Sequence, residues 1–117
     1  MLINRGKFND QQIIGRKTLA FMASNHLPQH MIPYSIGDSV RPGYGFGLGF
    51  RVLVDATALG LLSSLGEYGW AGAANTYFWI DPQEDLFGIF MNQYLGSQER
   101  PKARETFQAL TYQALID

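Results

Sequence analysis

The stretch EYGWAGAANTYFWIDP, residues 67–82, starts with small side chains and ends as an aromatic strand closed by an Asp-Pro pair. Glycine and alanine within a strand leave its backbone open to close approach by a ligand or another segment. The residues concerned are Trp70, Ala71, Gly72 and Ala73. They form the candidate site of this chain.

Three apolar segments predict an antiparallel sheet around this stretch. The first, GYGFGLGFRVLVD (residues 43–55), alternates apolar residues with glycines, which is typical of a strand with something packed closely on its glycine face. Residues 68–80 and 86–94 are apolar on both faces and are joined by the turn signal DPQED, so they predict a hairpin of interior strands. The predicted fold class is α+β, an antiparallel three-stranded meander with flanking helices.

Two helices are predicted to cover this meander. One spans residues 16–25, where apolar side chains recur at helical spacing, and the other begins near Pro101. The apolar stripe of the second helix is Ala103, Phe107, Leu110 and Ala114, with Lys102, Arg104, Glu105 and Gln108 facing outward. Residues 26–43 contain three prolines and predict an irregular connection. Because two helices cannot cover both faces of the sheet, residues 1–117 are predicted to be a single incomplete domain.

Composition limits the partners of the chain. Nine basic and ten acidic residues give a net charge of -1, so neither nucleic acid nor a membrane surface is an expected partner. There is no apolar run of about 18 residues that would predict a membrane span. The lack of cysteine excludes disulfides and a cysteine nucleophile, and it leaves both the cytoplasm and the periplasm open.

Familiar catalytic and cofactor motifs do not occur. The sequence has no Gly-x-Ser-x-Gly elbow and no Walker loop. His26 and His30 have helical spacing, but Pro28 lies between them and no third ligand is near, so neither a metal site nor a cofactor is predicted. For Trp70, a ligand pocket and ordinary core packing are equally good explanations.

The motifs GYGFGLGFRV and GEYGWAGAANTYFWIDPQEDLFGIFMNQ, with the opening MLINRGKFNDQQIIGRKTLAFMASNHLP, resemble the C-terminal part of the serine β-lactamase-like hydrolases. This family includes class C β-lactamases, related carboxylesterases and penicillin-binding proteins. The resemblance covers nearly the whole chain. It implies a sheet covered by helices on both faces, and a serine that forms an acyl-enzyme with help from Ser-x-x-Lys, Tyr-x-Asn and a pocket strand.

The same resemblance implies a role for each candidate residue. Trp70, Ala71 and Gly72 match the substrate-binding pocket strand, and Ala73 matches the catalytic position whose backbone N–H completes the oxyanion hole. Tryptophan at position 70, where many β-lactamases carry lysine or histidine, favours an ester over a β-lactam as the small-molecule substrate. A purely structural alternative is that the small residues allow close helix packing.

The remaining family motifs are absent from this sequence. No serine is followed three residues later by lysine, and no tyrosine is followed two residues later by asparagine. We therefore expect a fragment that is inactive alone and lends its pocket strand and oxyanion N–H to a serine on a missing N-terminal segment. The alternative is a non-catalytic binding or self-assembling module, in which a second copy pairs with the sheet edge at residues 86–94.

Overall fold

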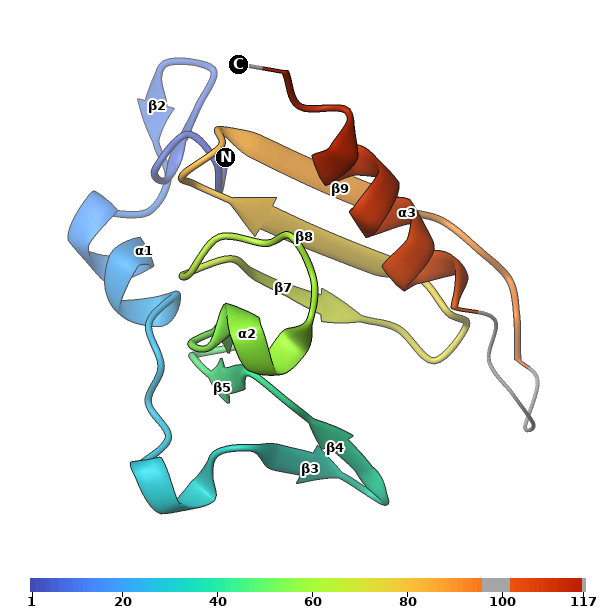
Figure 1. Cartoon of the computed structure of the whole chain (residues 1–117). Coiled ribbons are helices and arrows are strands. Elements are labelled where there is room, and N and C mark those ends of the chain that lie inside the picture. Colours follow the sequence, from blue (N-terminus) through green and yellow to red (C-terminus); the bar gives the residue numbers. More distant parts are fainter. Residues whose placement is uncertain (96–101, 117) are drawn as a thin grey trace.

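The computed structural model describes residues 1–95 and 102–116, and its centre is a five-stranded antiparallel sheet in which strands adjacent in sequence lie side by side (Figure 1). The strands are β5 (Tyr44–Phe46), β6 (Arg51–Leu53), β7 (Tyr68–Ala71), β8 (Tyr77–Asp81) and β9 (Leu86–Phe90). The predicted α+β class with an antiparallel sheet is confirmed. The prediction of three strands is wrong, because the sheet has five.

Each of the first two predicted strands is in fact a hairpin. Residues 43–55 turn between β5 and β6, where Gly49 has φ +96° and Phe46 pairs with Arg51. Residues 68–80 turn between β7 and β8, where Asn75 has φ +62°. Positive φ is the left-handed region that glycine and asparagine tolerate best. The alternation of residues 43–55 continued through the first turn, and the apolar character of both faces of residues 68–80 concealed the second.

Close packing on the glycine face of residues 43–55 is confirmed. A Cβ added at Gly45 would lie 2.2 Å from the Asn25 side chain, and one at Gly47 would lie 2.2 Å from the Met22 carbonyl oxygen. Both neighbours belong to the end of helix α1 (Arg16–Met22), the helix predicted over residues 16–25, and to the residues directly after it. The glycines therefore let the helix end dock against the β5–β6 hairpin.

The segment predicted to be irregular, residues 26–43, contains regular structure. It forms a 3₁₀ turn, η1 (Gln29–Met31), and an antiparallel hairpin of β3 (Tyr34–Ile36) and β4 (Ser39–Arg41). Strands of three residues are too short to show a period of two, which explains why the prediction was wrong. We call residues 34–41 the β3–β4 arm; Figure 1 shows it extending beyond β5 at one end of the sheet.

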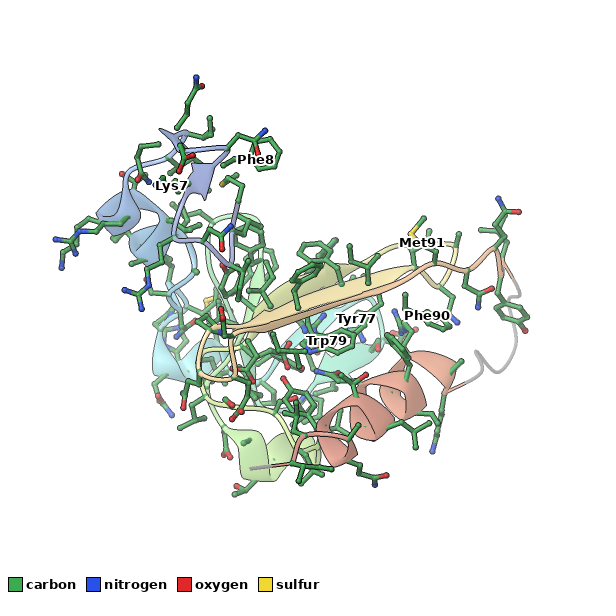
Figure 2. The ribbon with its side chains drawn as sticks, turned by 90° about the horizontal axis from the view of Figure 1, so that it is seen from above. Lys7, Phe8, Tyr77, Trp79, Phe90 and Met91 are labelled. Carbon is green, nitrogen blue, oxygen red and sulfur yellow. The ribbon has the colours of Figure 1, made fainter. Side chains whose placement is uncertain are left out.

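Helix α3 (Ala103–Gln113) covers one face of β8 and β9, while its predicted start at Pro101 lies outside the described residues. Figure 2 shows Tyr77, Trp79 and Phe90 pointing to the α3 side of the sheet. The predicted apolar stripe is right only in part: the Phe107 ring packs against Trp79 and Phe90, but the buried residues of the helix are Gln108 and Tyr112, and Leu110 is 58% exposed.

The opposite face of the sheet is only partly covered. Val52, Tyr68 and Ile80 are buried there beneath the N-terminal residues Leu2 and Ile3. No described helix lies over the β8–β9 end of this face, although the sequence predicted helices on both sides (Figure 2). The remaining elements are two short strands and one short helix: β1 (Lys7–Phe8), β2 (Gln11–Gln12) and α2 (Ala56–Leu59).

The hairpin predicted at DPQED is confirmed, because β8 and β9 pair on either side of it. The Asp81 carboxylate caps this turn by accepting the backbone N–H groups of Gln83 and Glu84 at 3.0 and 3.4 Å. It is fully buried rather than solvated, and it also accepts the Tyr112 hydroxyl of α3 at 2.7 Å. Within the described part of the chain, no helix has the length and apolar character needed to cross a membrane.

Candidate functional site

A pocket of about 620 Å³ opens where β7 ends, a volume within the roughly 300–1,000 Å³ typical of small-molecule sites. Its walls come from the end of β7, the β3–β4 arm, the segment around the end of α2, and α3. All four residues singled out from the sequence line it: Trp70, Ala71, Gly72 and Ala73. Segments far apart in the chain thus meet around the stretch that the sequence indicated.

The backbone N–H of Ala73 is unengaged in this wall. Gly72 N–H donates to the Thr76 carbonyl at 2.8 Å, and Asn75 N–H donates to the Gly72 carbonyl at 3.2 Å. Between them, Ala73 N–H donates to no acceptor in residues 1–95 and 102–116. Ala73 is also exposed and lines the pocket.

Packing inside the β7–β8 hairpin accounts for part of the small-residue pattern. A Cβ at Gly69 would lie 2.1 Å from the Phe78 carbonyl oxygen, and one at Gly72 would lie 2.1 Å from the Thr76 hydroxyl. These close contacts come from strand β8 and the turn before it, not from a helix. Gly69 and Gly72 therefore allow close packing within the hairpin. Ala71 and Ala73 have only methyl side chains and add little bulk to the pocket wall.

Trp70 belongs to a row of aromatic rings that reaches the β3–β4 arm. Its indole meets the Phe46 ring edge-to-face, with centroids 5.3 Å apart, and Phe46 meets Tyr34 in the same way at 5.7 Å. Edge-to-face contacts of this kind fix ring orientation. Trp70 is half-buried and lines the pocket, so its ring forms an apolar wall in a fixed orientation.

A buried arginine that the sequence analysis missed lies at the base of the pocket. Arg51 is 6% exposed, and its guanidinium stacks between the Tyr44 and Tyr77 rings at 4.6 and 4.5 Å from their centroids. Nη2 donates to Glu67 Oε1 at 2.9 Å and also to the Tyr77 hydroxyl oxygen. A buried ion pair needs such additional hydrogen bonds to offset its desolvation.

Gln108 connects this ion pair to helix α3. Its Oε1 accepts the Tyr77 hydroxyl at 2.9 Å, and its Nε2 donates to Glu67 Oε2 at 2.9 Å and Ser63 Oγ at 3.1 Å. These bonds satisfy the buried amide, which is why a residue predicted to face outward is 1% exposed. The only sequence signal for this network is a charged Arg51 inside an apolar run.

Burial keeps the phenols of the pocket protonated. It raises the pKa of Tyr44 to about 12, although the neighbouring Arg51 charge acts in the opposite direction. Burial also raises the pKa of Tyr34, partly offset by the charges of Arg51 and Arg41. The phenols therefore act as neutral hydrogen-bonding groups.

Sequence comparison finds distant relatives. No protein-family model matches the chain. "Uncharacterized protein MT1414" from Mycobacterium tuberculosis strain CDC 1551 / Oshkosh and "Protein Rv1367c" from strain H37Rv are each 26% identical over 98 residues. The match covers 80% of this chain and 24% of each relative, so the chain spans about a quarter of their length.

Solved structures share the fold. EstCE1, a hydrolase with promiscuous acyltransferase activity, matches 94% of this chain and 26% of its own, with a TM-score of 0.75 and 23% identity. Simvastatin synthase (LovD) from Aspergillus terreus matches 99% of this chain and 32% of its own, with a TM-score of 0.70 and 19% identity. Both have the β-lactamase-like serine hydrolase fold. This chain therefore has the fold of part of that class.

Proposed function

We propose that the chain is the C-terminal part of a serine hydrolase that acts on esters or β-lactams through an acyl-enzyme. The observation that carries the proposal concerns Ala73, which lines a ligand-sized pocket and whose N–H has no hydrogen-bond acceptor among the described residues. The Trp70 ring, packed edge-to-face on Phe46, lines the same pocket. The fold shared with EstCE1 and LovD supports it. Since this sequence lacks Ser-x-x-Lys and Tyr-x-Asn, the nucleophile and its base come from an N-terminal segment.

In this mechanism the chain supplies binding and charge stabilisation. When the serine attacks the acyl carbonyl, the carbonyl oxygen becomes negative, and Ala73 N–H donates to it together with the N–H of the serine. A donor of this kind lowers the barrier by about 3 kcal/mol, but only when the nucleophile is present. Trp70 packs against the apolar part of an ester, while Ala71 and Gly72 allow its backbone approach.

The test compares the chain alone with the chain joined to the segment encoded upstream of Met1, which we call the complemented protein. The substrates are p-nitrophenyl butyrate and a chromogenic cephalosporin. We expect no turnover by the chain alone, and turnover with a burst of product by the complemented protein, faster on the ester. No turnover after demonstrated assembly, or an upstream frame without Ser-x-x-Lys, would contradict the proposal.

A second candidate function, a non-catalytic self-assembling module, is favoured by the exposed end of the sheet. β9 is the last strand in the sheet, and Phe87, Ile89 and Met91 on or just after it are 56%, 58% and 78% exposed. An apolar edge strand is a template for pairing with another strand. This candidate predicts a stable homo-oligomer by light scattering, whereas a monomer at high concentration would exclude it.

A further inference from the structure

The pocket that contains Trp70 and Ala73 has an excess of positive charge that the proposed acyl transfer does not use. The charged side chains that line it are Arg41, Arg51, Arg104 and Glu105. They come from the β3–β4 arm, strand β6 and helix α3. Three cations therefore share the wall with one carboxylate.

Two of the three arginines have a carboxylate neighbour. Arg51 is paired with the buried Glu67 at 2.9 Å, and Arg104 lies 3.8 Å from Glu105. Arg41 takes part in no ion pair formed by the described residues. Among residues 1–95 and 102–116, and with Glu67 included, the charges of the site sum to one positive charge, and Arg41 on the arm is the arginine outside the ion pairs of this set.

Hydrogen bonding leaves the positive charge at the base of the pocket incompletely satisfied. The Nε–H of Arg51 is enclosed and has no acceptor in the described part of the chain, although Arg51 is more than nine-tenths buried. Arg41 is half-buried at the end of β4, where it pairs in register with Tyr34, and its charge acts to lower the pKa of Tyr34. A partly desolvated guanidinium at a pocket wall binds a carboxylate by two parallel hydrogen bonds.

Apolar side chains line the same pocket as Arg41. Ile36 and Val40 of the arm are 46% and 55% exposed and line the same pocket, as do Leu59, Leu61 and the Trp70 indole. Resting on the proposed function, which makes this pocket the substrate site, we propose that Arg41 selects ligands in which one carboxylate is attached to an apolar body. The single surplus charge matches a single negative charge on the ligand.

The test is an NMR titration of the 117-residue chain with 4-phenylbutyrate and with its neutral counterpart, 4-phenylbutanamide. The Trp70 indole and Gly72 amide signals report on the pocket, and their dispersion shows that the chain is folded. The carboxylate is expected to bind on the order of tenfold more tightly than the amide, because it gains a charge-assisted hydrogen bond. This preference should shrink in high salt.

Three variants locate the effect. Arg41→Gln should bind the acid and the amide equally, Arg41→Lys should keep part of the preference, and Arg16→Gln, on the exposed surface of α1, should keep all of it. Equal affinities in the parent chain, no binding of either probe, or an unchanged preference in Arg41→Gln would overturn the proposal. The titration needs no nucleophile, so its failure is independent of failure in the turnover assay.

Discussion

The two faces of the β8–β9 hairpin are completed in different ways. On the α3 face, Trp79 is 0% exposed, and Gly88 below it has no side chain because a Cβ there would lie 2.0 Å from the indole. On the other face, Phe87 and Ile89 are 56% and 58% exposed. Along β9, Gly88 thus faces a buried core, whereas the side chains of Phe87 and Ile89 are exposed on the opposite face. The described residues cover the α3 face of this hairpin and leave side chains of the other face exposed.

The largest expected effect on the free energy of unfolding comes from a change on the α3 face. Glu67→Gln keeps the shape of the buried side chain but removes the charge paired with Arg51 at 2.9 Å. Removing one partner of a buried ion pair leaves an uncompensated charge, so the free energy of unfolding should fall by about 3 kcal/mol. Urea denaturation followed by circular dichroism measures this fall.

The matched control for this change is Glu84→Gln, which removes the same charge from an exposed position in the β8–β9 turn. Its free energy of unfolding should stay within about 0.5 kcal/mol of the parent chain. Equal losses in the two variants would show that the network around Arg51 does not hold α3 on the sheet.

Loss of the Tyr44 proton at alkaline pH should weaken the same face, with a smaller effect than loss of the Glu67 charge. Burial raises the pKa of Tyr44 from 10.0 to about 12, so the folded chain holds this proton more tightly than the unfolded chain. The resulting stability is complete below pH 10 and is lost between pH 10 and 12, by about 1.4 kcal/mol per pH unit. Tyr44→Phe should reduce the slope of unfolding free energy against pH in that range. An unchanged slope would contradict burial of the phenol.

The smallest expected effect on stability is on the uncovered face. Phe87→Thr and Ile89→Thr replace exposed side chains by a residue that suits a strand, so each should change the free energy of unfolding by less than about 0.5 kcal/mol. If this face binds further protein, light scattering should show reduced self-association of both variants. A loss of stability above 2 kcal/mol would mean that the face is buried within the chain itself.

Strong local signals in the sequence were sufficient for part of the fold. The DPQED turn and the apolar pattern of α1 gave the right elements, because a turn motif and helical spacing are local properties. The turns inside residues 43–55 and 68–80 were missed, since Gly49 fits the alternation of the first segment and Asn75 lies within a mainly apolar second segment.

The candidate site was predicted only in part for a related reason. Trp70 and Ala73 lie three residues apart in one stretch, and the match of that stretch to the family's pocket-strand motif was enough to indicate them. Gln108 bonds to Glu67, which lies 41 residues away, and Arg41 reaches the pocket through an arm too short to show periodicity. Long-range polar contacts of this kind leave no local pattern.

The Ala73 N–H is tested most directly by replacing the amide before Ala73 with an ester in the complemented protein, which removes one donor and leaves the side chain unchanged. The matched control is the same replacement before Ala74, a neighbour that does not line the pocket. We predict that kcat for p-nitrophenyl butyrate falls on the order of 10²–10³-fold for the Ala73 ester and stays near the parent value for the control. An unchanged kcat for the Ala73 ester, or equal losses in both proteins, would contradict an oxyanion donor at this position.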